Sequence, residues 1–250
     1  MVFDPCPTAL TSGRVASWKF AGETGDWLDL SGTYTLTNNA TVQTLKASTG
    51  EGVIGPTSMC NWGNLEFWST TASAILRNGS AATRCIVTFH RFSDFTAQEC
   101  LNCPFSSDST QLRLYPITTA ALANNIIAIA NGSSTSTAFG SFAFDEPILW
   151  AIKTDGTSST TFQGYKISDS SQVYTSTIAS APGTVTTAYF GRLVPTGQTA
   201  YNSSEATLDM LQVFDSSLSD ANLQSICEHI RNQQAKVQEY LRGHLQGLTI

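Results

Sequence analysis

Charged side chains are scarce in this sequence, and basic ones do not predominate. Only 13% of its 250 residues are Asp, Glu, Lys or Arg, which is about half the fraction in an average globular protein. This low charge disfavours a helical bundle, whose exposed faces would need many more Glu, Lys and Arg. Lys and Arg number 13 against 19 acidic residues. Without a basic cluster, the chain lacks the electrostatic footprint needed to bind nucleic acid.

Long apolar runs and a leader sequence are also missing. No stretch reaches the roughly 20 apolar residues that a membrane-spanning helix requires. The first seven residues, M-V-F-D-P-C-P, lack the basic and apolar regions of a signal peptide. Two explanations stay open: a leader has been removed and a Met added, or the protein is made without entering the secretory route.

Cysteine is too rare for a disulfide-dense scaffold, because six cysteines are spread over the whole chain. Cys100 and Cys103 have C-x-x-C spacing. A zinc site would need a second such pair or a His pair, and a thioredoxin-like redox site would need a βαβ context. Neither is present, so a loop disulfide or free thiols are the main interpretations of this pair, ahead of metal binding and redox chemistry.

Ser and Thr, in contrast, make up about a quarter of the chain, which suits β-strands that face water through hydroxyl groups. Apolar residues alternate with polar ones at short intervals. The expected strands are 15–20, 84–92, 111–115, 148–153, 160–167, 173–178, 184–190 and 207–214, and residues 120–130 are expected to form a hairpin around Asn124-Asn125. Turn signals every 8–12 residues predict a β-sandwich or barrel. We expect an N-terminal arm at 1–11 and one domain at 12–218.

A helical pattern begins after Leu218. Ser219 is suited to the N-cap, and Leu218 to the hydrophobic staple that precedes it. Leu223, Ile226 and Ile230 then repeat with helical spacing, so this helix is expected to pack on an apolar surface. Residues 219–250 are therefore predicted to form a C-terminal helix and tail.

The apolar stripe resumes in the second part of this helix, at Val237, Tyr240, Leu241 and Leu245. It is longer than one edge of a sandwich needs as cover. Exposed stripes of this kind mark partner contacts. We expect these four residues to contact a protein partner or a second copy of the chain; folding back onto their own sandwich is the alternative.

Several segments, in order, resemble the laminin-G-like, concanavalin A-like family. They are V-A-S-W-K-F at 15–20, D-L-S-G at 29–32, I-L-W at 148–150 with D-G at 155–156, T-A-Y-F-G-R at 187–192, and L-D-M-L-Q-V-F at 208–214 followed by L-S-D-A at 218–221. The resemblance covers roughly residues 12–230. It implies an all-β fold, a two-sheet antiparallel jelly-roll sandwich, to which this chain adds the C-terminal amphipathic helix.

The resemblance also leaves calcium open as a cofactor. Jelly-roll relatives often hold Ca²⁺ at a sheet rim through an Asp carboxylate and backbone carbonyls, as suits a cation that prefers oxygen ligands. Asp29 and Asp209 stand where such ligands are expected. The alternative for Asp29 is an Asx-turn, in which the side chain caps its own loop.

Catalytic patterns are weak. A glycoside hydrolase of this fold needs carboxylates on one strand face, as in E-x-D-x-x-E. The nearest approach here is Glu205 and Asp209. No G-x-S-x-G nucleophile motif or glycine-rich phosphate loop occurs. We therefore expect that the protein is not an enzyme.

Tryptophans suggest where a glycan could stack. Trp18 and Trp150 alternate into the expected core, whereas Trp27, Trp62 and Trp68 lie in loop-like stretches and are candidate ligand-binding residues. The favoured function is a surface module for recognition or assembly through protein or glycan contacts, at a cell surface, outside the cell or in a virion. A structural virion coat or decoration component is the first alternative, and a glycoside hydrolase is the last.

Overall fold

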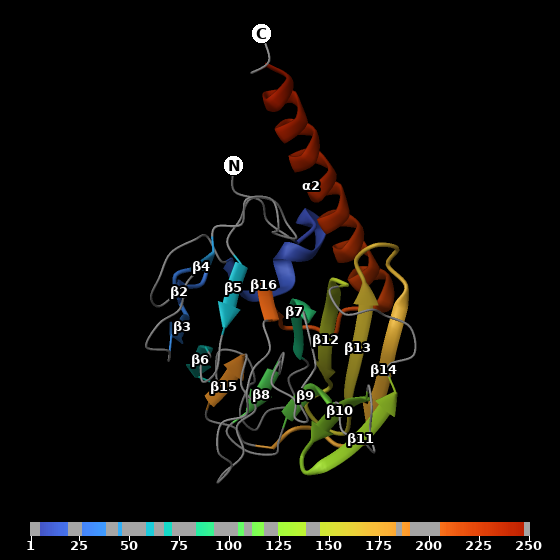
Figure 1. Cartoon of the computed structure of the whole chain (residues 1–250). Coiled ribbons are helices and arrows are strands. Elements are labelled where there is room, and N and C mark those ends of the chain that lie inside the picture. Colours follow the sequence, from blue (N-terminus) through green and yellow to red (C-terminus); the bar gives the residue numbers. More distant parts are fainter. Residues whose placement is uncertain are drawn as a thin grey trace.

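The structure, a computed structural model, describes residues 6–19, 27–38, 45–46, 59–62, 68–71, 84–92, 105–107, 112–117, 125–138, 146–183, 187–190 and 206–247. The described part consists mostly of antiparallel β-strands, with one α-helix near its C-terminal end and one short 3₁₀-helix, η1 (Thr8–Gly13), near its start. The sequence prediction of a β-rich protein with a C-terminal helix is thereby confirmed (Figure 1).

The described strands form two sheets of eight strands each. Sheet I has the order β14 (Gln172–Ile178), β13 (Thr160–Lys166), β12 (Ile148–Thr154), β7 (Arg84–Phe92), β16 (Ala206–Phe214), β5 (Met59–Trp62), β4 (Leu45–Lys46), and β1 (Arg14–Lys19) also pairs with β16. Sheet II has the order β11 (Ser133–Ala138), β10 (Asn125–Ala130), β9 (Leu112–Ile117), β8 (Phe105–Ser107), β15 (Thr187–Phe190), β6 (Trp68–Thr71), β3 (Thr35–Asn38), β2 (Trp27–Leu28).

A hydrophobic core joins the facing sides of the two sheets. Because successive side chains of a strand point to opposite faces, every second residue of the central strands enters this core. Sheet I contributes Trp18, Ile86, Trp150 and Phe162, and sheet II contributes Leu112, Leu114, Ile126 and Ala128, all at most 2% exposed. The predicted inward orientation of Trp18 and Trp150 is confirmed.

Residues 120–124 of the predicted 120–130 hairpin lie outside the described residues, and for residues 125–130 the hairpin prediction is wrong. Asn125 begins β10, which runs without a break to Ala130 and pairs with β9 on one side and β11 on the other. The tight turn follows this strand, at Asn131-Gly132, where both residues have positive φ (47° and 78°). Asn and Gly tolerate this conformation, which a two-residue hairpin turn requires. The decisive signal was therefore Asn131-Gly132 and not the earlier Asn pair.

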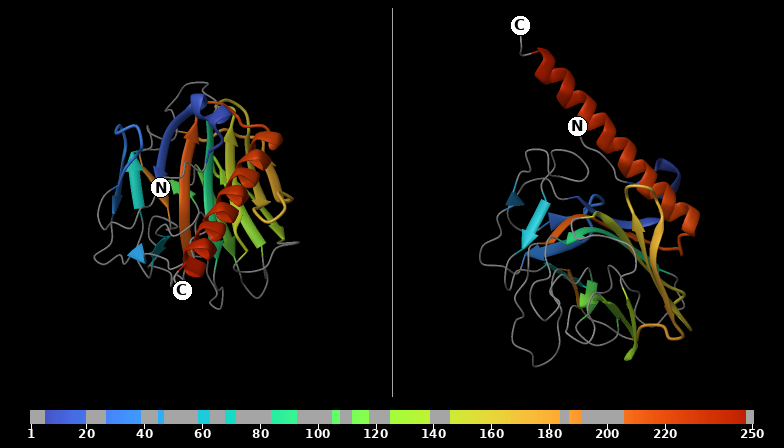
Figure 2. Two further views of the ribbon diagram at one scale, coloured as in Figure 1. Left: turned by 90° about the horizontal axis from the view of Figure 1, so that it is seen from above. Right: turned by 45° about the vertical axis from the view of Figure 1, so that its right-hand side comes forward.

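Helix α2 (Asp220–Gly247) covers the outer face of sheet I. Its residues Leu223, Ile226, Cys227 and Ile230 are fully buried against outward-facing residues of sheet I such as Val87 and Leu149. Cys6 and Leu10, from the N-terminal segment, join the same cluster. Sheet II thus buries the inner face of sheet I, and α2 buries the part of the outer face that β7, β12, β13 and β16 form. In both side views the far end of the helix extends beyond the sheets (Figures 1 and 2).

Candidate functional site

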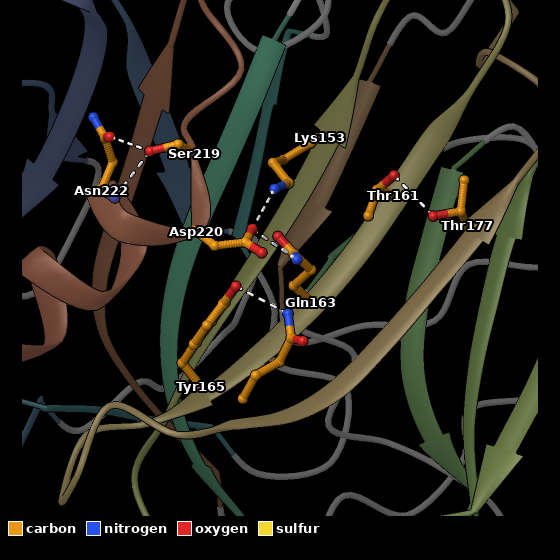
Figure 3. A network of polar contacts seen from close by, with 9 residues as sticks. Lys153, Thr161, Gln163, Tyr165, Thr177, Ser219, Asp220 and Asn222 are labelled. Atoms are coloured by element: carbon orange, nitrogen blue, oxygen red, sulfur yellow. Dashed lines mark hydrogen bonds and ion pairs between the residues drawn. The ribbon is translucent and has the colours of Figure 1, made fainter.

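A polar cluster fixes the start of α2. Ser219 is the N-cap, because its Oγ accepts a hydrogen bond from the backbone N–H of Asn222 at 3.2 Å, as predicted. Asp220 Oδ1 accepts hydrogen bonds from Lys153 Nζ at 3.1 Å and Gln163 Nε2 at 3.0 Å, on β12 and β13 (Figure 3). One carboxylate therefore binds the first turn of the helix to two neighbouring strands of sheet I.

Ionisation in this cluster follows from its contacts. The hydrogen bond from Gln163 and the ammonium of Lys153 outweigh partial burial and lower the pKa of Asp220. Burial, together with the charge of Asp220, raises the pKa of Tyr165, which stays protonated and accepts a hydrogen bond from Gln172 at 2.9 Å. Asp220 is thus a charged anchor. A general acid for glycoside hydrolysis needs the opposite shift.

A second anchor follows Ile230, the last buried side chain among those that the structure describes in α2. Arg231 Nη1 donates to the backbone oxygen of Ile167 at 2.6 Å and to Ser170 Oγ at 2.7 Å. Both acceptors belong to the turn between β13 and β14, where Ser170 has a positive φ of 62°. Because the guanidinium holds this turn from the helix side, the first twelve residues of α2 (220–231) are fixed at both ends.

The rest of α2, residues 232–247, extends past this anchor. At 1.5 Å per residue, these sixteen residues span about 24 Å. The predicted partner-contact residues Val237, Tyr240, Leu241 and Leu245 all lie here, in the helical backbone that the structure describes. Figure 2 shows this part of the helix leaving the body of the molecule. Their role in contacts stays a prediction.

Asp29 is the centre of a compact turn. Its Oδ1 accepts from the backbone N–H groups of Thr33 at 2.8 Å and Tyr34 at 2.7 Å, and its Oδ2 accepts from the N–H and hydroxyl of Ser31 at 3.0 and 2.6 Å. Burial alone would raise the pKa of Asp29, but these bonds outweigh it and lower the pKa. The carboxylate caps its own loop, which is the alternative considered for it from the sequence.

A cavity of about 200 Å³ lies beside this turn. It is bounded by η1, by the start of β1 and by the turn itself. The lining residues are Thr11, Arg14, Val15, Ala16, Ser17, Asp29, Leu30 and Ser31. Leu30, one of these residues, is 54% exposed, which is unusual for a large hydrophobic side chain in the described part of the protein.

Sequence reasoning did not find this cavity. The sequence predicted a role for Asp29 and none for Arg14 or Ser17. An alternating strand pattern indicates which residues share a face of the sheet, but it does not indicate which strand lies at an open edge. One signal was available in the sequence. Residues 15–20 and residues 29–32 resemble two consecutive segments of the family pattern, a strand and the turn that follows it.

The predicted aromatic residues lie in strands, and the loop-like assignment is wrong. Trp62 ends β5 in sheet I, Trp68 begins β6 in sheet II, and Trp27 begins β2 at the edge of sheet II. Pairing with neighbouring strands of the same sheet overrides the local preference of Gly and Asn for loops. The structure describes these residues by their backbone, so their ligand-binding role stays a prediction.

The predicted calcium ligands come from different elements. Asp209 lies in β16 at a β-bulge, between Leu208 and Met210, where the register with β7 shifts. Over the described residues, no three His, Cys, Asp or Glu side chains gather as a metal site would require. Glu205, the other carboxylate of the weak hydrolase pattern, lies outside the described residues. The calcium role of Asp29 and Asp209 stays a prediction.

Among the described residues, three cysteine side chains are buried: Cys6, Cys85 and Cys227. Burial raises the pKa of Cys85 and of Cys227 to about 12, so both are protonated and unreactive near neutral pH. Cys100 and Cys103 lie outside the described residues. In the described part of the protein, cysteine therefore contributes to packing.

Comparisons with known proteins support the fold. No family model and no curated protein matches the sequence. Among solved structures, the chain is similar to one of botulinum neurotoxin type C, which enters cells in a manner dependent on two ganglioside molecules (TM-score 0.61, 10% identity, 89% of this chain and 52% of that chain). It is also similar to the serotype D binding domain (0.60, 10%, 88% and 53%).

A third similar structure is the binding domain of botulinum neurotoxin DC in complex with rat synaptotagmin II (TM-score 0.61, 11% identity, 88% of this chain and 52% of that chain). The chain spans about half the length of each of these structures. At such low identity, the likeness establishes a shared β-rich fold and carries no residue-level function. No described helix is long and apolar enough to cross a membrane.

Proposed function

We propose that the protein is a non-catalytic recognition module with a laminin-G-like, jelly-roll sandwich, which binds glycan or protein at its surface. The observation that carries this proposal is the likeness of nearly the whole chain to domains whose purpose is binding. The toxin domains are associated with gangliosides and with synaptotagmin, and the proposal extends to this chain the class of role, not those ligands.

Four of the described carboxylates support a non-catalytic role. Hydrogen bonds from neighbouring side chains and backbone groups lower the pKa of Asp155, Asp169 and Asp220, and outweigh burial in lowering that of Asp29. Each accepts hydrogen bonds that hold a turn or a helix start. A carboxyl group engaged in this way is a poor general acid, because protonation would break the contacts that it makes.

A glycan array tests recognition. The wild-type chain is applied with and without a calcium chelator, beside Trp62→Ala and beside Thr177→Ala, a matched control at an exposed position of β14. We expect retention of at least one glycan by the wild type and the control, with weaker retention by Trp62→Ala. Loss of retention on chelation would assign a role to calcium.

A second candidate function, assembly, is favoured by the length of α2. Two anchors fix its first twelve residues, whereas sixteen more extend beyond them with an apolar stripe in the sequence. A helix stripe that continues past its own sheet can pair with the same stripe of a second copy. In this form the protein would be a structural component of an assembly, such as a virion coat or decoration.

Light scattering tests assembly. Truncation after Gln234 keeps the Arg231 anchor and removes the stripe, and a Val237→Asp, Leu241→Asp variant changes the stripe alone. Glu239→Ala, at an exposed position of the same segment, is the control. We expect the wild type and the control to be oligomeric and the other two monomeric. A monomeric wild type that also retains no glycan on the array would overturn both candidate functions.

A further inference from the structure

Helix α2 carries its buried residues and its later apolar residues on the same face. In the anchored part, Leu223, Ile226 and Ile230 are fully buried against sheet I. Each residue of an α-helix is rotated by about 100° from the one before it. Val237 and Leu241 therefore lie within about 20° of the direction of Ile230 around the helix axis. The face that packs on sheet I thus continues into residues 232–247, the extended segment.

The exposed residues of the extended segment lie on the opposite face. Those that the structure describes as exposed are Asn232, Ala235, Lys236, Glu239, Arg242 and Gly243. By helical position, all six lie at least about 120° from the direction of Ile230. They include every Asp, Glu, Lys and Arg of the segment. The continuing face has none of these charges, so it is suited to an apolar partner surface and not to a charged one.

The end of sheet I limits where such a partner can lie. Among the described side chains of α2, burial reaches as far as Ile230, and Arg231 binds the β13–β14 turn just beyond it. Figures 1 and 2 show the helix leaving the sandwich past this point. A partner of the continuing face must therefore lie on the sandwich side of the helix and must stop where sheet I begins.

The anchored part of α2 excludes a parallel pair of helices. In a parallel pair in register, residues 220–230 of two chains would also face each other, but each chain already buries this face under its own sheet I. A staggered parallel pair would place the extended segment of one chain on the anchored part of the other, with the same conflict. In an antiparallel pair, two extended segments overlap along about 24 Å, and neither helix runs into a sheet.

The antiparallel overlap also pairs charges at its ends. When Gly247 of one chain is level with Arg231 of the second copy, Val237 is level with Leu241 of that copy, and Leu241 with its Val237. The C-terminal end of a helix has unsatisfied carbonyl groups and a partial negative charge. Each helix would therefore end near the guanidinium that anchors the other, which is favourable. The overlap then uses the whole length of both extended segments.

We propose that α2 is a dimerisation element whose extended segments pair antiparallel with those of a second copy, about a two-fold axis at the level of Glu239. The inference rests on the proposed assembly function and names its partner and geometry. A second copy supplies an uncharged stripe of the same length, and a two-fold interface is complementary to itself. The strip is about 24 Å long on a helix about 10 Å wide, which is small for an interface. We therefore expect a Kd on the order of 10 μM.

Charge substitutions in the stripe distinguish the geometries. Analytical ultracentrifugation measures the Kd of Val237→Lys, of Leu241→Glu and of the variant that combines both. In the antiparallel pair, each single variant leaves an unpaired charge against an apolar residue at both levels, so the Kd should rise about a hundredfold. The combined variant places Lys opposite Glu at both levels and should return to within about tenfold of the wild type.

Two controls accompany these variants. Val237→Lys combined with Leu241→Lys carries as many substitutions but places like charges together, so it should stay monomeric. Glu239→Lys, on the exposed face, should dimerise like the wild type. Because all positions lie past the Arg231 anchor, the variants should fold normally, and urea unfolding checks this.

The outcomes separate this inference from assembly itself. A wild type that is monomeric at about 100 μM, roughly tenfold above the expected Kd, would overturn both. Self-association that survives truncation after Gln234 would mean that assembly uses another surface, which also overturns the inference. If truncation abolishes the dimer but the Lys–Glu variant stays monomeric, assembly through α2 stands and the antiparallel geometry is wrong. A mixture of Val237→Lys with Val237→Glu that dimerises would then indicate a parallel pair.

Discussion

Gly164 of β13 offers a sharp test of the core. A Cβ atom added there would lie 2.8 Å from Cζ3 of Trp150, 3.1 Å from Cε3 and 3.2 Å from Cη2. Trp150 is 1% exposed, and its ring packs edge-on against Tyr174 with centroids 5.8 Å apart. The rigid indole therefore cannot move aside without disturbing both sheets. Gly164→Ala should destabilise the protein by about 1–3 kcal/mol, the usual cost of overpacking a core.

An opposing contribution is smaller. Replacing Gly by Ala restricts the unfolded chain and favours folding by about 0.4–1 kcal/mol, so the net effect stays destabilising. Gly243→Ala is the matched control, because nothing lies within 4 Å of the added Cβ in α2. There the same substitution should stabilise the helix, by up to about 1 kcal/mol.

Urea unfolding followed by tryptophan fluorescence measures both variants. A double-mutant cycle with Trp150→Phe adds the mechanism, since the smaller ring removes the outer part of the indole that the new methyl group would strike. Gly164→Ala should cost less in the Trp150→Phe background than in the wild type. If Gly164→Ala proves as stable as the wild type, or if its cost is the same in both backgrounds, the packing argument is wrong.

Three further predictions concern the Asp29 turn, the buried thiols and the β10–β11 hairpin. Asp29→Ala should cost about 1–3 kcal/mol in urea unfolding, because buried N–H groups lose their acceptor. Since the folded pKa of Asp29 is lowered, its stabilisation is present above about pH 4 and is lost as the pH falls through the folded pKa. The difference in unfolding free energy between the wild type and Asp29→Ala should therefore shrink in acid. A difference that stays constant down to pH 2, a strongly acidic limit, would contradict this. Cys85 and Cys227, with a thiolate fraction on the order of 10⁻⁴ at pH 8, should resist iodoacetamide until the protein is unfolded, and rapid native labelling in peptide mapping would refute their burial. Gly132→Ala, at φ 78°, should lower the free energy of unfolding by about 1–2 kcal/mol, whereas an unchanged urea midpoint would argue against the positive-φ turn.

The fold could be predicted where local pattern and tertiary packing agree. Strong alternation found β7 and β12, and the N-cap at Ser219 with its apolar repeat found α2. Prediction failed for the short strands that carry Trp27, Trp62 and Trp68. Strands of two to four residues contain too little pattern to be distinguished from loops, and only pairing with distant strands stabilises them.

The candidate cavity illustrates a different limit. Asp29 could be recognised as a turn residue from D-L-S-G, but its bonds to Thr33 and Tyr34 depend on the path of the following loop. Ser17 alternates outward from β1, and sequence alone would expose it to solvent. It is buried because the Asp29 turn and η1 approach the same strand edge. The elements that bury Ser17 are distant from it in the sequence or lie across a turn. Such burial depends on tertiary structure and cannot be predicted from the local sequence pattern.

The position of α2 restricts where any ligand or partner can bind. The inner face of sheet I is occupied by the core that it shares with sheet II. The part of its outer face formed by β7, β12, β13 and β16 lies under α2, and access to that part would require release of the Asp220 and Arg231 anchors together with exposure of four fully buried apolar side chains. Burial of one such side chain is worth about 1.5–3 kcal/mol, so a weakly bound sugar could not displace the helix. A glycan that binds to sheet I must therefore use a part of the sheet that α2 leaves open, and the edge beside the Asp29 turn, with its cavity of about 200 Å³, is one such part.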